Sequence, residues 1–152
     1  MMGGGNQQMQ QLQQELQELE EQKQQLEEEV EELKAEKSDM DDAIEAIETL
    51  DTGSTVQVPL GGGAYVRAEV QDIDEVVVEL GGGYAAERDQ QGAVESMETR
   101  KDSVDERIDE LQSEISDVED ESNELEQEAR QMQQQQMQQQ MQQMQQQEDE
   151  SE

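Results

Sequence analysis

The spacing of apolar residues over the first fifty positions restricts the fold of this chain more than any other feature. They are separated by three or four residues or by one heptad, and Glu and Gln fill nearly every position between them. That period is typical of a helix that packs along one seam in a coiled coil. The seam residues are Met9, Leu12, Leu16, Leu19, Leu26, Val30, Leu33, Met40, Ile44 and Ile47, with Lys23 and Lys37 at the two remaining core positions. We predict one helix over residues 6–52, in which the two lysines restrict the register.

The same pattern returns in the second half of the chain and predicts another helix over residues 88–132. Its seam residues are Val94, Met97, Val104, Ile108, Leu111, Ile115, Val118, Leu125, Ala129 and Met132, with Lys101 and Ser122 as polar members. The two seams are equally long and are joined by a compact insert. We therefore expect an antiparallel helix pair in which the numbers of opposed residues sum to about 140.

The insert, residues 53–87, differs in composition from both helices. Gly53 is suited to a left-handed cap that ends the first helix, and Val, Tyr, Thr and Gly then replace Glu and Gln. Two triple-glycine runs, Gly61–Gly63 and Gly81–Gly83, each separate alternating apolar segments, which is typical of β-hairpins. We predict an α+β, mostly helical fold: a long antiparallel coiled-coil hairpin with two β-hairpins inserted between the helices.

The apolar face of the insert indicates assembly. Isolated hairpins are marginally stable, and uncovered strand edges pair with other strands. We expect the insert to join separate chains rather than to form a core of its own. The predicted oligomerisation residues are Val56, Val58, Leu60, Val66, Val70, Val76, Val78 and Leu80.

Composition argues against an enzyme. The chain has no histidine and no cysteine, which are the side chains that most often act as acids, bases, nucleophiles and metal ligands near neutral pH. The glycine runs lack the Lys-Ser or Lys-Thr of a phosphate-binding loop, and the carboxylates show no calcium-loop spacing. We therefore expect no catalytic residue, no cofactor and no metal site.

The net charge restricts the partners. With 9 basic against 42 acidic residues, the formal charge is -33, which opposes binding to nucleic acid or to anionic membranes. No signal peptide and no membrane-spanning stretch is expected, so we predict a soluble, cytoplasmic protein. Because concentrated salt screens such repulsion, we also predict a salt-accumulating host.

The end of the chain, residues 133–152, is a Gln/Met-rich tract that closes on an acidic run. Composition leaves open whether it is a frayed helix or disordered. By the expected register, this end lies near the start of the first helix. Methionine-rich surfaces accommodate many partners, although helix ends also simply tolerate unbranched residues. The candidate contact residues at this tip are Met9, Leu12, Leu125, Met132, Met137 and Met141.

The whole arrangement resembles the alpha subunit of archaeal prefoldin, a family of ATP-independent chaperones. Two long heptad helices around two hairpins contribute to the resemblance. The specific part is the hairpin sequence, which comprises Gly53–Gly61 (GSTVQVPLG), Ala64–Ala68 (AYVRA) and Val76–Gly81 (VVVELG). The resemblance covers nearly the whole chain, residues 1–152, as a single domain, except for the Gln/Met tract.

The resemblance implies a hexamer of two alpha and four beta subunits, in which hairpins form a platform and helical tips hold unfolded proteins. Family members pass these clients to a group II chaperonin without hydrolysing nucleotide. Carried over, the implied platform residues are Val56, Val58, Val66, Val76 and Val78, and the implied capture residues are Met9, Leu12, Leu125 and Met132. The long Gln/Met extension departs from the family's usual shorter end.

Two other functions are compatible with these features. The chain is a structural scaffold or tether if its insert only joins the coiled-coil helix pairs of several chains and no client binds. A role as an acidic mimic of nucleic acid, which binds a nucleic-acid-binding protein in place of its nucleic acid, is less compatible with these features.

Overall fold

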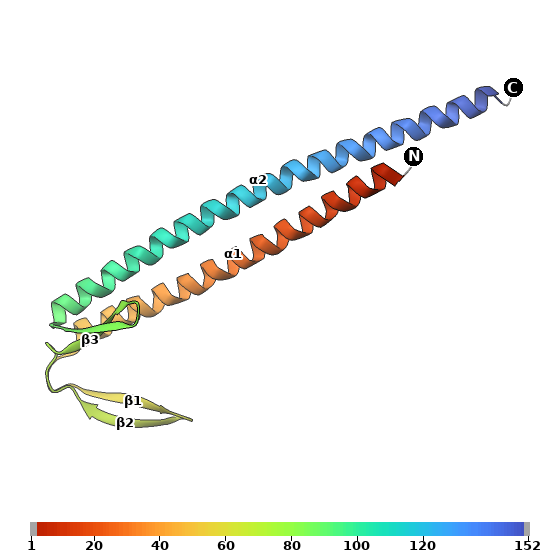
Figure 1. Ribbon diagram of the computed structural model, residues 1–152. Helices are drawn as coiled ribbons and strands as arrows, with labels where there is room; N and C mark the ends of the chain where they lie inside the picture. Colours follow the sequence, from red (N-terminus) through yellow and green to blue (C-terminus); the bar gives the residue numbers. More distant parts are fainter. Residues whose placement is uncertain (1–2, 151–152) are drawn as a thin grey trace. The chain divides into compact units, whose positions relative to one another are not determined.

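Two long helices flank two small β-hairpins in the computed structural model, which describes residues 3–150 (Figure 1). The elements are α1 (Gly3–Thr49), β1 (Thr55–Gly61), β2 (Ala64–Glu69), β3 (Val76–Gly81), β4 (Tyr84–Arg88) and α2 (Gln90–Glu150). The predicted fold class is confirmed. Within residues 3–150, neither helix contains a stretch long and apolar enough to cross a membrane.

The chain divides into two compact units that each contain part of both helices. The central unit, residues 31–109, holds the end of α1, both hairpins and the start of α2. The terminal unit holds the residues up to 30 and those from 110 onward, and all its described residues are helical.

In both units the helices run antiparallel in the same register. Lys37 Nζ lies 2.5 Å from Asp105 Oδ1 and Lys101 Nζ lies 2.5 Å from Asp41 Oδ1, both within the central unit. In the terminal unit Lys23 Nζ lies 3.2 Å from Glu119 Oε1. The residue numbers of each pair add up to 142, which confirms the expected register.

The predicted seam is confirmed by burial. Every seam residue of both helices is buried or half-buried, including the polar members Lys23, Lys37, Lys101 and Ser122. The Glu and Gln side chains between them are nearly all exposed. The most deeply buried seam residues are Leu12, Val30, Met40, Ile108, Leu111 and Val118. Apolar burial along one stripe of each helix therefore holds the pair together.

The helices differ in extent from the predicted ranges. α1 begins at Gly3 and ends at Thr49, whereas the expected range was 6–52. α2 begins at Gln90 and continues through the Gln/Met tract to Glu150, well beyond residue 132. Gln, Met and Glu are good helix formers, and the tract contains no Gly or Pro to stop the helix.

Gly53 is not the cap that ends α1, contrary to the sequence-based expectation. It has the expected positive φ of 92°, but it lies four residues beyond the helix, in a turn where its N–H donates to Val70 O. The amide of Gln90, at the start of α2, instead donates to one carbonyl in the last turn of α1 and to one just after it. Its Nε2 lies 2.7 Å from Ile47 O and 3.0 Å from Leu50 O.

Each β-hairpin closes on a two-residue glycine turn, as predicted. β1 pairs with β2 up to Gly61 and Ala64, and β3 pairs with β4 up to Gly81 and Tyr84. The turn residues Gly62 and Gly63 have φ of 60° and 83°, the doubly positive combination that suits the twist of a tight hairpin. Among the described residues, each hairpin is a separate two-stranded sheet.

Side-chain hydrogen bonds connect the segments between these elements. Thr52 Oγ1, after α1, accepts from Ile73 N in the linker between the hairpins. Asp74 Oδ1, in the same linker, accepts from Gln90 N at 3.3 Å. Asp89 Oδ1 accepts from Gly92 N at 2.7 Å and caps the start of α2. The central unit therefore fixes both hairpin stems to the helix ends.

Candidate functional site

The end of α2 carries an apolar stripe that no other described residue covers. Met137, Met141 and Met144 are spaced by four and three residues, so they lie on one helix face. Their exposed fractions are 69%, 71% and 69%. We call these three residues the methionine stripe.

The stripe is distinct from the seam that faces α1. Continuing the heptad pattern beyond Met132 places glutamines, Gln136, Gln139, Gln143 and Gln146, at the seam positions. The methionines Met137 and Met144 each follow a seam position by one residue. One residue corresponds to about 100° of rotation around a helix, so the stripe lies beside the seam rather than on it.

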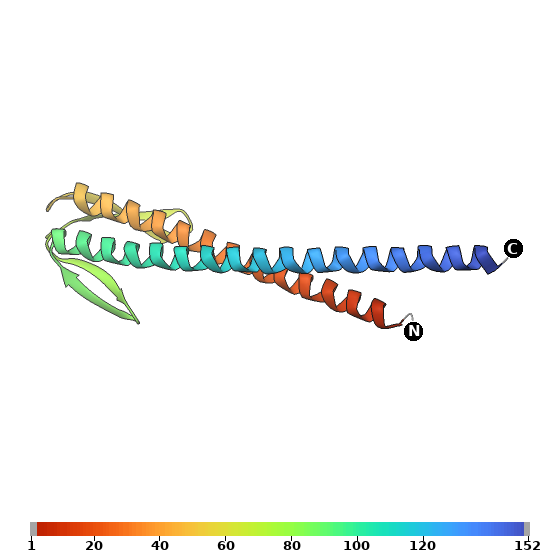
Figure 2. The same cartoon turned by 90° about the horizontal axis from the view of Figure 1, so that it is seen from above.

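α2 is still beside α1 just before the stripe begins. At Gly5 of α1, a Cβ atom would lie only 2.7 Å from Gln136 Nε2. Both views show the C-terminal end of α2 extending beyond the first residues of α1 (Figures 1 and 2). The stripe therefore begins beside the first described residues of α1.

The segment that carries the stripe is uncharged. Between Arg130 and Glu148 the chain contains only Gln and Met, whereas 34% of all its residues are charged. An apolar ligand approaching this face meets thioethers and amides, and does not have to displace the hydration of a carboxylate.

The six predicted tip residues fall into three groups. Leu12 is buried in the seam, with 8% of its surface exposed. Met9, Leu125 and Met132 are half-buried seam residues. Only Met137 and Met141 are freely exposed, and Met144, which was not among the six, completes their stripe.

A second exposed apolar surface lies on the hairpins of the central unit. Val58 pairs with Val66 across β1 and β2, and both are exposed together with Leu60. Val56 and Val70, from the same predicted set, are half-buried. Leu80 of the second hairpin is exposed. Four of the eight predicted oligomerisation residues are therefore available on the surface of the single chain.

β3 exposes to solvent a different valine from the two that the sequence predicted for the interface. Val78 is 4% exposed and Val76 is half-buried, whereas Val77, which was not predicted, is 64% exposed. Alternation in a strand separates two faces but does not say which of them the rest of the chain covers. Val78 therefore belongs to the chain's own core, and Val77 is the exposed valine of β3.

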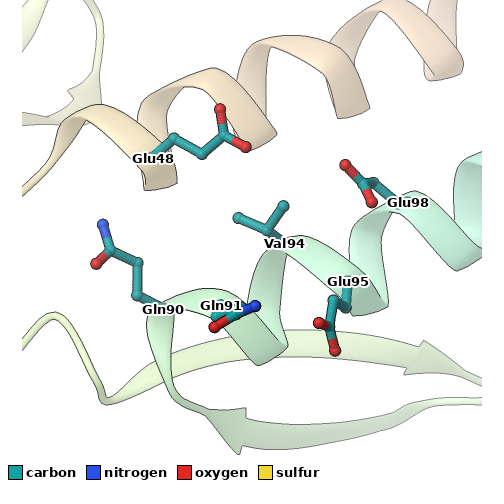
Figure 3. Close-up of a pocket in the computed structure, with 6 residues that line it drawn as sticks. All are labelled: Glu48, Gln90, Gln91, Val94, Glu95 and Glu98. Atoms are coloured by element: carbon teal, nitrogen blue, oxygen red, sulfur yellow. The ribbon is translucent and has the colours of Figure 1, made fainter.

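An open groove of about 440 Å³ lies between the end of α1 and the start of α2 (Figure 3). Glu48 stands on one side, opposite Gln90 and Val94, and Gln91, Glu95 and Glu98 complete the lining. The Gln90 amide is engaged by the α1 carbonyls. Within the described residues, no group of three His, Cys, Asp or Glu side chains is arranged to hold a metal ion.

The lysines of the seam form ion pairs across the two helices. The hydrogen bond that Lys23 donates to Glu119 and the attraction of the carboxylate's charge raise the pKa of Lys23 above its ordinary value of 10.5. A hydrogen bond to Asp41 raises the pKa of Lys101 in the same way. These polar seam members are therefore charged and paired at neutral pH.

Comparison with known proteins gives the family. The family model of prefoldin subunits matches residues 12–135, which is more than half of the chain. The chain belongs to the prefoldin family. The match includes most of both helices and both hairpins, and it ends just before the methionine stripe.

The most informative relatives are prefoldin alpha subunits of halophilic archaea. That of Halorubrum lacusprofundi is 62% identical over 103 residues, 68% of each chain. Those of Haloarcula marismortui and Natronomonas pharaonis are 69% and 74% identical over 52 and 50 residues. These two matches span about a third of the relatives' length, 34% and 33%. The similarity to the archaeal alpha subunit, and to halophilic versions of it, is confirmed.

A solved prefoldin structure has the same fold. A chain in the cryo-EM structure of filamentous PFD from Methanocaldococcus jannaschii superposes with a TM-score of 0.66 at 24% identity. The superposition covers 74% of this chain and 95% of that one. It shows that two helices around two hairpins is the prefoldin arrangement.

Sequence reasoning did not separate the methionine stripe of this prefoldin chain from its seam, and it missed the exposed Val77. The stripe could have been separated from the seam by continuing the heptad beyond Met132, because Met137 breaks its phase. The outward position of Val77 had no signal in the sequence, since Val76, Val77 and Val78 are chemically identical.

Proposed function

We propose that this chain is the alpha-type subunit of an ATP-independent chaperone that acts in the cytoplasm. It captures unfolded polypeptides and delivers them to a group II chaperonin. The observation that supports capture is the methionine stripe, three exposed thioethers on an uncharged segment of α2 that begins beside the first residues of α1. The prefoldin family membership supports the wider role.

The stripe has the properties that a loose, general contact requires. Methionine is unbranched and polarisable, so it adapts to apolar segments of many shapes. Three such residues bind weakly by themselves. Several subunits on one assembly raise the effective concentration, and a client held at several points dissociates slowly while each contact remains reversible.

The exposed hairpin face supports the assembly that this mechanism needs. We propose that Val58, Leu60 and Val66, with Leu80 and Val77 of the second hairpin, join this chain to beta subunits in a hexamer of two alpha and four beta chains. Two-stranded sheets with open edges and exposed valines are marginal alone. Pairing them between chains would cover both the edges and the apolar face.

The mass of the native complex that this chain forms with a beta subunit, measured in molar KCl, tests the assembly. Val58→Asp places a charge on the exposed face of β1 and should prevent the hexamer from forming with a beta subunit. Gln57→Asp adds the same charge on the opposite face of the same strand and should leave the hexamer intact. A Val58→Asp protein that still gives the full hexamer would contradict this interface.

Aggregation of a denatured client, followed by light scattering, tests capture. In the complex with beta subunits, changing Met137, Met141 and Met144 together to Ser should weaken suppression several-fold. Changing all three to Leu should preserve it, because Leu keeps the apolar surface and the helix. Leu12 is unsuitable as a target, since its burial in the seam would confound binding with stability.

The matched control is Gln139, Gln143 and Gln146 changed together to Ser, at the seam positions of the same helix segment. This variant should suppress aggregation as the wild type does. If the methionine-to-serine protein is equally active, the stripe does not capture clients. If the wild-type complex itself suppresses nothing, the chain is a structural scaffold or tether.

A further inference from the structure

The methionines of this chain differ sharply in exposure. Met40 lies in the seam with 5% of its surface exposed, and Met9, Met97 and Met132 are half-buried. The stripe residues are exposed over more than two thirds of their surface. The chain has no cysteine and no tryptophan, so its thioethers are the side chains most readily oxidised.

We propose that the methionine stripe is a reversible oxidation site, and that conversion of Met137, Met141 and Met144 to sulfoxides switches client capture off. The proposal rests on the proposed function, because it assigns a regulation to the same surface. It requires no further binding site and no change in the hairpins or the seam.

The reaction needs only a hydroperoxide as oxidant. A lone pair of Met Sδ attacks one oxygen of hydrogen peroxide, and the S–O bond forms as the O–O bond breaks. The proton on the transferred oxygen passes to the departing hydroxide, which leaves as water. Sulfur loses two electrons and the peroxide gains them. The dithiol of a methionine sulfoxide reductase reverses the step, and yields a disulfide and water.

The position of the stripe makes the effect of oxidation large and local. A sulfoxide is polar and accepts hydrogen bonds from water, so three of them convert the only exposed apolar face of this segment into a hydrated one. Glutamines surround the stripe and supply no apolar area in its place. The buried thioether of Met40 is protected by the seam, and the half-buried seam methionines are less accessible to peroxide than the stripe, so the helix pair survives while the stripe is oxidised.

The experiment uses the full chain in its complex with beta subunits, treated with hydrogen peroxide and sampled over time. Peptide mass spectrometry should show each stripe methionine oxidised about tenfold or more faster than Met40, following exposure. Suppression of client aggregation should fall several-fold as the stripe methionines become oxidised. Treatment with methionine sulfoxide reductase and a dithiol should restore it, while native mass stays constant throughout.

The decisive variant carries Leu at all three stripe positions. Its suppression of aggregation after peroxide treatment, measured relative to its own untreated level, should not fall, because it has no thioether there. The proposal is overturned if this variant loses activity as fast as the wild type, or if the wild type stays active with its stripe fully oxidised. The proposed function fails by a separate result. In that case the variant with Ser at all three stripe positions suppresses client aggregation as well as the wild type does, before any peroxide is added.

Discussion

At the scale of single residues, three lysines inside an apolar seam connect the two helices. Lys23, Lys37 and Lys101 replace core residues, which weakens a coiled coil, but each pairs with a carboxylate on the opposite helix. A shift of the helices by one heptad would place a carboxylate opposite only two of the three lysines in one direction, and opposite only one of them in the other. The lysines therefore select one alignment among several that the repeating Leu and Gln pattern would otherwise permit.

The alkaline stability of the protein should depend on these lysines. The folded-state pKa values of Lys23 and Lys101 are raised, so their stabilising effect is complete below the unfolded value near 10.5. It is lost as the pH rises through the folded values. We expect the melting temperature to fall above about pH 10.5, and to fall less steeply when both lysines are changed to Met.

Lys34→Met is the control for that measurement. Lys34 contacts Glu31 on its own helix at 3.8 Å and makes no cross-helix pair among the described contacts. Its removal also takes away one positive charge, but it should leave the alkaline slope of the wild type unchanged. Equal slopes for the double variant and the wild type would show that the cross-helix pairs do not contribute.

At the scale of the elements, the end of α1 depends on a side chain forty residues away. The two carbonyls that accept from Gln90 Nε2, at Ile47 and Leu50, are part-buried. Gln90→Ala leaves them without this donor and should lower the free energy of unfolding by about 1–3 kcal/mol. Urea unfolding of the chain measures the change.

The neighbouring residue provides the matched control. Gln91 is exposed, and Gln91→Ala makes the same change of side chain one position along the same helix. It should alter the free energy of unfolding by less than about 0.5 kcal/mol. If both variants lose the same amount, helix propensity accounts for the effect and the Gln90 hydrogen bonds do not.

The same elements show what the sequence could and could not predict. The seam was predictable because burial repeats with the heptad, and the hairpins because glycine triplets stand between alternating segments. The Gln90 contact was not, because it depends on how two helix ends approach one another. Nor was the burial of Val78 beneath exposed Val77, because strand alternation does not identify the covered face.

The candidate site was half predictable for the same reason. Composition pointed to methionine at the chain end, and Met137 and Met141 are indeed exposed. Met9, Leu12, Leu125 and Met132 were grouped with them by position along the chain. They lie on the face of the seam, where the heptad pattern already placed them, because the rotation of each residue about the helix decides its face.

At the scale of the whole molecule, a net charge of -33 dominates the response to salt. The described surfaces of both helices are lined with carboxylates, many spaced by four residues, where like charges repel. The screening length is about 10 Å at 0.1 M salt and about 3 Å at 1 M. The free energy of unfolding should therefore rise between dilute buffer and molar KCl.

A charge-reduced variant separates this repulsion from the general effect of salt. Glu28, Glu32 and Glu36 are exposed on one face of α1, and changing all three to Gln removes two neighbouring repulsions. In dilute buffer, the free energy of unfolding of this variant should exceed that of the wild type by about 0.5–1 kcal/mol. In molar KCl the difference should vanish, because salt already screens the native charges. A difference of the same size at both salt concentrations would mean that these carboxylates act through local helix propensity, and that repulsion does not limit the stability of this acidic chain.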